Sequence, residues 1–374
     1  MEMKLLDECC EILDSIRVPI TAKDRKKGPY PYYGANGVQD YVADYIFDDD
    51  LVLLAEDGGN FGSNEKPIAY KVSGKCWVNN HAHVLKPKAG MDVDYLCYSL
   101  MFYKVDGMVN GATRMKLTQA AMRKMLIPSR TFEEQKAIVR ILNQIQRLIK
   151  IEKEQIKNCD ELIKSRFVEM FGDMFQNTKR WPESRLELLA DLVSGITKGR
   201  KVKDIELQEV PYMAVSNVKD GYIDWTTVKT IMATKQEIEQ YRLLPDDVLM
   251  TEGGDPDKVG RGAIIKEPLE NSIHQNHIFR VRLNRKYLLP IFFEEYLQHQ
   301  KAKRYFLGCA KQTTGIASIN MRQLRALPVL APPLELQQKF SDFVRQIDKL
   351  RFATQKSLNE TQQLFDSLMQ KYFG

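Results

Sequence analysis

LIKSRFVEMFG (162–172) and LFDSLMQKYFG (364–374) resemble each other at an offset of 202 residues in this 374-residue chain. The same offset relates Gln135 to Gln337. Self-similarity at a fixed offset is weighed before any other pattern, because missing it misassigns the whole fold. The sequence therefore predicts an internal duplication in which each copy ends in the same kind of element.

That element is a long helix, predicted over 132–173 and again over 334–374. Apolar residues recur with a 4,3 spacing in both copies, which is the pattern of a coiled-coil seam. At about 1.5 Å per residue, each helix of about 40 residues would be roughly 60 Å long. A second apolar row, including Leu148, Leu162, Leu350 and Leu364, widens each stripe. The residues expected at the helix seam, or where a partner docks, are Ile138, Leu142, Ile145, Ile149, Ile156, Ile163, Phe340, Val344, Ile347, Leu358, Phe365 and Leu368. The alternative is two unrelated amphipathic helices that pack on separate domains.

The regions before the helices, 1–131 and 174–333, alternate short apolar runs with turn dipeptides, which predicts mixed α/β globules. They resemble each other weakly: DLVLLAEDGG (50–59) parallels DVLMTEGG (247–254), and an Asn-His pair occurs in both. We therefore expect an α+β chain with two globular domains separated by two long antiparallel helices, related by a pseudo-two-fold axis.

Composition narrows the class of protein. The net charge is +6, and hydrophobic residues make up 44% of the chain, enough for real cores. No stretch approaches the roughly 20 apolar residues of a membrane span, and the first residues are acidic where a signal peptide would be basic. The six cysteines form no CxxC pair, which favours a reducing, cytoplasmic setting.

At this point the sequence resembles the specificity subunits of type I restriction-modification systems over its whole length. The resemblance rests on the order of several motifs: GPYPYYGANGVQDYV (28–42), LLAEDGGNFG (53–62), KCWVNNHAHVLKP (75–87), HQNHIFRVR (274–282), GIASINMRQLRALPVLAPPLELQQ (315–338) and TFEEQKAIV (131–139). The sequence departs from the family at 127–135, which lacks the proline-rich helix entry that the second copy has at 329–337.

The resemblance implies a DNA-binding subunit with two target-recognition domains, each of which reads one half of a split double-stranded DNA site. The long helices would act as spacer and docking surface for methylation subunits, two by expectation, and for restriction subunits. S-adenosylmethionine, ATP and Mg²⁺ would be used by these partners, and this chain would bind no cofactor.

The residues themselves support a non-catalytic role. The chain has no GxxxxGK[ST] loop for ATP and no Asn/Asp-Pro-Pro-aromatic motif of adenine methyltransferases. His81-x-His83 and His274-x-x-His277 lack Cys or His partners at zinc-finger spacing, so no metal is expected. Asp57 and Glu252, beside Gly-Gly turns, are better explained by turn geometry or base contact than by a nuclease. A stand-alone methyltransferase or nuclease with divergent motifs, and a scaffold that binds no DNA, remain the alternatives.

Candidate DNA contacts follow from chemistry, because phosphates need Lys, Arg or backbone N–H, and base edges need Asn, Gln, Arg or acids. The first globule offers a basic run followed by aromatics, for which a solvated loop with inward tyrosines is the alternative. An Asn-His pair could equally cap a strand. The candidates there are Lys26, Lys27, Tyr30, Tyr32, Asn36, Asn60, Asn80, His81, Arg114 and Lys116.

The second globule offers a similar basic loop, a Gly-rich GGDPDKVGRG stretch and a polar loop before a helix near Met321. That loop could hold a phosphate at the helix N-terminus, or Ser318 or Asn320 could simply cap the helix. The candidates are Lys198, Arg200, Lys201, Lys203, Asp255, Lys258, Arg261, Gln275, Asn276, Lys311, Gln312, Thr313, Ser318 and Asn320.

Overall fold

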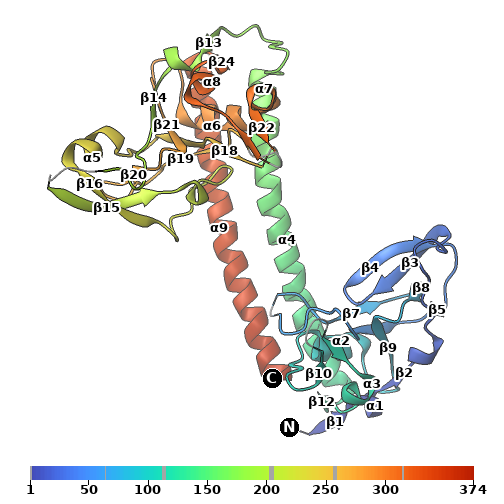
Figure 1. Cartoon of the computed structure of the whole chain (residues 1–374). Coiled ribbons are helices and arrows are strands. Elements are labelled where there is room, and N and C mark those ends of the chain that lie inside the picture. Colours follow the sequence, from blue (N-terminus) through green and yellow to red (C-terminus); the bar gives the residue numbers. More distant parts are fainter. Residues whose placement is uncertain (1, 64, 112–114, 202–205, 256–258, 314–315) are drawn as a thin grey trace. The chain divides into compact units, whose positions relative to one another are not determined.

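The computed structural model describes residues 2–63, 65–111, 115–201, 206–255, 259–313 and 316–374 (Figure 1). It divides into two compact units: a first unit of Met1–Glu154 with Gln355–Gly374, and a second unit of Gln155–Thr354. Two 40-residue helices, α4 (Phe132–Phe171) and α9 (Leu334–Phe373), each contribute one part to each unit. The mixed α/β class and the two long helices predicted from the sequence are confirmed. The boundaries of the two compact units differ from the predicted domain boundaries, because each unit includes part of both long helices.

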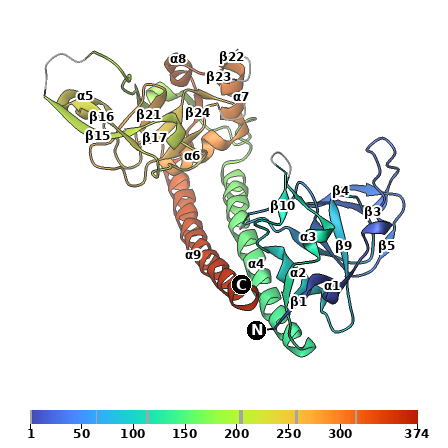
Figure 2. The ribbon, with the colours of Figure 1, turned by 60° about the horizontal axis from the view of Figure 1, so that its bottom comes forward.

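The first unit contains two four-stranded sheets with the orders β2-β9-β6-β7 and β4-β3-β8-β5. The central strand β6 is a continuous apolar run, LVLLA, buried at every position, as a strand covered on both faces requires. Helix α2 packs against β6 and β7, and α4 lies beside it (Figures 1 and 2). Asp92 caps α2 by accepting from the backbone N–H of Asp94 and Tyr95. The elements are β1 (Met3–Leu5), α1 (Leu6–Cys9), β2 (Cys10–Ile12), β3 (Lys27–Gly34), β4 (Gly37–Val42), β5 (Phe47–Asp48), β6 (Leu51–Ala55), β7 (Ala69–Val72), β8 (Lys75–Val78), β9 (Ala82–Pro87), α2 (Val93–Met101), β10 (Val109–Asn110), β11 (Lys116–Leu117), α3 (Gln119–Met122) and β12 (Leu126–Pro128).

The second unit repeats the main sheet strand for strand and the smaller sheet with one strand fewer. Its main sheet has the order β14-β21-β17-β19, and its smaller sheet has the order β16-β15-β20. In both units the smaller sheet contains an antiparallel pair joined to one parallel strand: β3 with β8, and β15 with β20. The elements are β13 (Glu183–Arg185), β14 (Ala190–Ser194), β15 (Leu207–Met213), β16 (Lys229–Thr234), α5 (Lys235–Tyr241), β17 (Val248–Thr251), β18 (Gly253–Gly254), β19 (Gly262–Ile264), β20 (Ile273–His274), β21 (Ile278–Leu283), α6 (Pro290–Gln298), α7 (Gln300–Cys309), β22 (Lys311–Thr313), β23 (Ile316–Ser318), α8 (Met321–Arg325) and β24 (Pro328–Leu330). The predicted duplication is thereby confirmed.

Within each unit, the parts of α4 and α9 run antiparallel. In the first unit Ser357 donates to Glu152 Oε1 at 2.5 Å, and the Tyr98 ring of α2 lies 6.4 Å from the Phe365 ring, tilted by 57°. In the second unit Arg351 donates to Asp160 at 2.6 Å, and Phe167 lies edge-on to Phe340 at 5.4 Å. Polar residues on the helices thus bond across the pair.

The predicted seam residues are largely inaccessible. Nine of the twelve are buried: Ile138, Leu142, Ile145, Ile149, Ile163, Phe340, Val344, Leu358 and Phe365. The others, Ile156, Ile347 and Leu368, are half-buried. This burial agrees with a role in the helix seam. The nine buried residues have no accessible surface on which a partner could dock. The residues of the second apolar row differ in exposure. Phe167 and Phe171 are buried, whereas Leu148, Leu162, Leu350 and Leu364 are exposed.

Each globule is fastened to its own long helix by a buried glutamine. Gln135 Oε1 accepts from the backbone N–H of Asp92, and its Nε2 donates to the carbonyls of Gly90 and Arg130. Gln337 makes the same three bonds, with Leu289 N, Tyr287 O and Pro332 O. Each buried side chain pairs three backbone groups where the long helix meets its globule, which explains why this position is glutamine in both copies.

Replacing Gln337 by leucine keeps the side-chain volume and removes all three bonds. Because each buried backbone group left without a partner costs about 1–3 kcal/mol, Gln337→Leu should lower the free energy of unfolding by about 2 kcal/mol or more. Urea unfolding of the full chain measures this. Gln338→Leu is the matched control, since Gln338 is exposed and bonds only within α9, to Asp342. Equal stability of the two variants would contradict the anchoring role.

Candidate nucleic-acid interface

Polar side chains gather at one edge of the sheets in the first unit, where β6 and β8 end and β3 turns into β4. Asn36 Nδ2 donates to Gly58 O at 3.0 Å, which ties the β3–β4 turn to the Asp57-Gly58 turn. Asn79, buried, donates to Gln39 Oε1 and accepts from the backbone N–H of His81. Asp57 Oδ1 lies 2.7 Å from His81 Nδ1. We call this surface the first polar edge.

A buried charged network supports the first polar edge from below. His83, 1% exposed, donates from Nε2 to Leu117 O, and its Nδ1 lies 2.6 Å from Asp14 Oδ2. Glu56 accepts from Arg17 Nη1 at 2.7 Å and pairs with Lys116 at 2.9 Å. Burial alone would raise the pKa of both carboxyls. The hydrogen bonds from His83 to Asp14, and from Arg17 and Lys116 to Glu56, outweigh burial and lower both pKa values.

Asp14, Glu56 and His83 bring three potential metal ligands within 4.8 Å of one another. Their ligand atoms are already engaged by Arg17, Lys116 and Leu117 O, so the cluster is satisfied by the protein itself. This arrangement holds the turn at Glu56 and the strand β11 together, because Leu117 N also donates to Glu56 O.

The second polar edge lies at the equivalent place in the second unit. Glu252 N donates to His277 O, and Ile319 N donates to Glu252 O. The first unit has the same two backbone bonds, from Glu56 N to His81 O and from Leu117 N to Glu56 O. Glu252 Oε2 lies 2.5 Å from His277 Nδ1, and Asn276 Nδ2 lies 3.4 Å from His277 Nε2. His277 therefore occupies the position of His81.

A cavity of about 200 Å³ opens beside the second polar edge. Lys198, Lys229 and Gln275 contribute polar groups to its lining, and Tyr212 and Ile231 contribute apolar surface. The buried Tyr212 hydroxyl donates to Ile196 O. Two cations and an amide around a small cavity can bind phosphate or a base edge.

Most of the residues predicted to contact DNA are exposed or half-buried, although Lys26 and Lys27 lie at the start of β3, at the end opposite the β3–β4 turn. The exposed ones are Lys26, Lys27, Asn36, Asn80, Lys116, Lys198, Lys201, Asp255 and Lys311. The half-buried ones are Tyr30, Asn60, His81, Arg261, Gln275, Asn276 and Ser318. Asn60 donates to Pro67 O, and Tyr30 packs against Tyr45. Arg114, Lys203 and Lys258 lie outside the described residues, as do the side chains of Gln312 and Thr313.

Three of the predicted contacts are engaged inside the fold. Tyr32 is 1% exposed and its hydroxyl bonds both backbone groups of Ile20, so the alternative of an inward tyrosine applies. Arg200 makes two bonds of 2.6 Å to Glu237. Asn320 caps α8 by accepting from Gln323 N, which agrees with the helix-capping alternative given for that residue. Tyr32 is corrected to a buried strand anchor, because its ring has no surface to offer DNA.

The sequence reading missed the pairing of an acid with each histidine. The sequence explains Asp57 and Glu252 by turn geometry or base contact, and His277 is not among its candidates. A signal was present: the acid after each central strand precedes its histidine by 24 residues in one copy and 25 in the other. Lys229 was missed because it starts β16, far along the chain from the other basic residues of the second globule.

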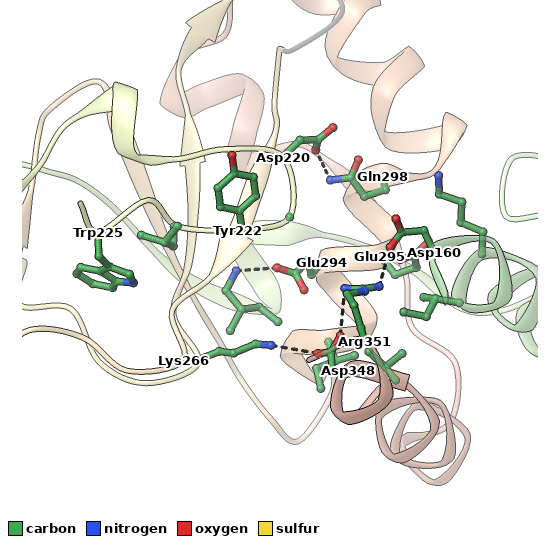
Figure 3. A pocket seen from close by; sticks show the side chains of 17 residues that line it. Asp160, Asp220, Tyr222, Trp225, Lys266, Glu294, Glu295, Gln298, Asp348 and Arg351 are labelled. Carbon is green, nitrogen blue, oxygen red and sulfur yellow. Dashed lines mark hydrogen bonds and ion pairs between the residues drawn. The ribbon is translucent and has the colours of Figure 1, made fainter. Parts of the chain in front are cut away.

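A groove with a volume of about 620 Å³ lies in the second unit (Figure 3). Its charged residues are five acids, Asp160, Asp220, Glu294, Glu295 and Asp348, and three bases, Lys164, Lys266 and Arg351. The bases are partly engaged, since Lys266 and Arg351 pair with Asp348. An acidic groove repels phosphate, so this groove is not the nucleic-acid interface.

Burial raises the pKa of Glu294 to about 7, while its Oε1 accepts from Ile264 N at 2.8 Å. A carboxyl with a raised folded-state pKa adds stability below its unfolded pKa and loses it as the pH rises through about 7. Glu294→Gln keeps the acceptor oxygen and removes the charge. We expect it to raise the melting temperature at pH 8, with a gain that shrinks towards pH 5. Glu267→Gln, at an exposed site in the same unit, is the control, and a pH-independent difference for Glu294→Gln would contradict this account.

Comparison with known proteins places the fold in context. The family model described as "Type I restriction modification DNA specificity domain" matches residues 1–159 and 179–363, once in each half. The fold is similar to that of a type I restriction-modification S subunit from M. genitalium, with a TM-score of 0.62 and 14% identity, covering 100% of this chain and 96% of the other.

Two relatives carry matching names. A putative type I restriction enzyme specificity subunit of Haemophilus influenzae is 37% identical over 38% of this chain and 37% of its own length. The EcoKI specificity subunit of Escherichia coli is 21% identical over 86% of this chain and 74% of its own length. The matched region thus spans less than half of the first relative. Because the family model covers most of the sequence, in two copies that coincide with the structural repeat, the chain belongs to the type I restriction-modification DNA specificity family.

Proposed function

We propose that this chain is the sequence-specific DNA-binding subunit of a type I restriction-modification system. It reads a bipartite target in double-stranded DNA and directs methylation and restriction subunits to it. The observation that carries this proposal is the duplicated polar edge, built by the same backbone bonds in both units. Two equivalent readers in one chain fit a target with two parts.

The chemistry of the edges suits DNA. Asn and Gln side chains can pair with adenine, and Lys and Arg bind guanine or phosphate. An exposed lysine accompanies each edge: Lys116, which bridges to Asp57 in the first unit, and Lys198, which lines the cavity with Gln275 in the second. Lysines beside amides would supply phosphate contacts for affinity and base contacts for specificity.

The long helices offer docking surfaces that repeat in the same way. Leu148 and Leu350 occupy equivalent positions at an offset of 202 residues, as do Leu162 and Leu364. All four are between 49% and 55% exposed. Exposed apolar side chains at equivalent positions indicate protein contact sites. Because they occur twice, we propose that two methylation subunits dock on this row of leucines, in place of the buried seam residues.

Catalysis belongs to the partners in this proposal. The methylation subunits would use S-adenosylmethionine, and the restriction subunits would use ATP and Mg²⁺, while this chain binds no cofactor of its own. We place the protein in the cytoplasm, consistent with six cysteines that are all unpaired. No helix among the described residues is long and apolar enough to cross a membrane.

Methyl transfer tests the proposal. The purified full-length chain should bind DNA but transfer no methyl group from S-adenosylmethionine, whereas the chain purified together with its methylation subunit should methylate adenine at a bipartite sequence. Radiolabelled methyl incorporation, followed by sequencing of the modified sites, measures both. Methylation by the chain alone at an undiminished rate would contradict the proposal.

A docking variant provides the matched control. Leu148→Glu with Leu350→Glu places charge on the exposed row and leaves both polar edges intact. DNA binding by the chain should persist, and methylation in the presence of the methylation subunit should fall. Unchanged methylation would show that the partner docks elsewhere.

A further inference from the structure

One backbone position carries a side-chain amide in both units. Asn79 directly follows β8 and Gln275 directly follows β20, and each of these strands runs parallel to a neighbour in the smaller sheet. The backbone N–H of Asn79 donates to Tyr33 O, and that of Gln275 donates to Met213 O. Because Tyr33 and Met213 also pair with the last residues of these strands, the two amides occupy equivalent places in the repeat.

The first of these amides is used inside the fold. Asn79 is 3% exposed, its Nδ2 donates to Gln39 Oε1 at 3.0 Å, and its Oδ1 accepts from the backbone N–H of His81 at 2.8 Å. Gln275 is half-buried, and its side chain has no hydrogen-bond partner among the residues that the structure describes. The acceptor oxygen and the two N–H donors of Gln275 are therefore open to a ligand.

Gln275 lines the cavity of about 200 Å³ beside the second polar edge together with two lysines. Lys198 and Lys229 are exposed, and neither forms an ion pair within the described part of the chain. No acid is among the described residues that line the cavity. The turn that carries Lys198 is held two residues later, where Arg200 makes two bonds of 2.6 Å to Glu237 of α5. The cavity therefore combines an open amide with two positive charges, which attract phosphate.

The first unit carries the opposite charge at the position of Lys229. Lys229 of β16 lies opposite the buried Tyr212 of β15. In the first unit Asp40 of β4 lies opposite the buried Tyr32 of β3, and Asp40 pairs with Arg25 at 3.3 Å. The smaller sheets thus share a backbone and a buried tyrosine but present different charges. Readers of two different half-sites require such a difference.

The rest of the cavity lining is mainly apolar. Tyr212 is buried, and Ala214 and Ile231 are half-buried. Thr230, which also lines the cavity, donates to Glu209 at 2.6 Å. In the major groove of DNA, a glutamine amide bonds both N6 and N7 of adenine, and an apolar side chain contacts the methyl group of thymine. These two features belong to the same base pair, so an open glutamine beside apolar side chains matches an A·T pair.

We propose that Gln275 reads an adenine in one half of the bipartite target, with Ala214 and Ile231 against the methyl group of the paired thymine. Lys198 and Lys229 bind phosphates beside this base pair and carry no base preference. The inference rests on the proposed function and names a base pair, the side chains that recognise it and the unit that presents them.

The test uses the full chain assembled with its methylation subunit and a pool of duplexes randomised across the target. The duplexes that the complex retains are sequenced, so the readout is binding and does not depend on which adenine is methylated. Gln275→Leu keeps a similar side-chain volume and removes the amide. It should reduce the preference for adenine roughly tenfold to hundredfold at one position of one half-site and leave the other half-site unchanged. Gln236→Leu, at an exposed site on α5 outside the cavity, is the matched control.

A second variant separates base reading from a structural role. Gln275→Glu keeps the shape of the side chain and replaces its N–H donors by an acceptor. Because a carboxylate accepts from the N4 amino group of cytosine, this variant should lose the preference for adenine and gain one for cytosine at the same position. A side chain that only stabilised the fold would change the melting temperature and not the preferred base.

The lysines have a different readout. Lys198→Gln and Lys229→Gln should weaken binding to all duplexes alike, and each should reduce the slope of log affinity against log salt concentration by about one. Lys286→Gln is the control for loss of an exposed positive charge, because Lys286 lies beyond the end of β21 that is far from Gln275. This control should leave the slope unchanged.

Three results would overturn the inference. One is an unchanged base preference after both substitutions of Gln275. Another is equal weakening of binding to all sequences after Gln275→Leu, which would assign the amide to phosphate or to stability. The third is a changed base preference after either lysine substitution, which would move base reading from the amide to a lysine. In each case a wild-type complex that still selects a bipartite sequence leaves the proposed function intact, whereas a wild-type complex without any sequence preference would refute the function itself.

Discussion

The buried amides of Gln135 and Gln337 are the contacts on which the placement of each reader depends. Each amide makes three hydrogen bonds: two to the loop that enters α2 or α6, and one to the carbonyl five residues before it, just ahead of its own long helix. The amide oxygen and both N–H groups are therefore engaged. Because the globule is bonded to a side chain of the long helix, the helix cannot rotate or slide against it without breaking these bonds. The antiparallel helix pairing in each unit completes that fixed support.

The two units use different buried polar groups on the same backbone frame. The first unit places Asp14, Glu56 and His83 under the turn at its polar edge. In the second unit Arg280, 3% exposed, donates to the carbonyls of Gln240 and Arg242 and to Asp191. Arg282 makes two bonds to the buried Asp247, at the end of β17 opposite Glu252. The backbone plan therefore repeats between the units, whereas the buried polar side chains differ.

The repeat and the long helices could be predicted from sequence, because apolar spacing and turn residues are local signals. The burial of Tyr32 could not, since its strand pairs with β8, some 45 residues later in the chain. The exposure of Leu148 and Leu162 could not be predicted either. Both are apolar and recur along the helix as regularly as the buried Leu142, and only the packing of the globule distinguishes them. Similarly, Asp57 and His81 in the first unit, and Glu252 and His277 in the second, lie in separate turns, and no local pattern shows that their side chains meet.

The central claim is that each half of the chain reads its own part of one DNA target. The most direct measurement replaces residues 174–333 with the corresponding region of a relative and sequences the adenines methylated by the resulting complex. The account predicts that one half-site changes its bases while the other half-site and the gap between them stay the same. A change in both half-sites, or in neither, would contradict it.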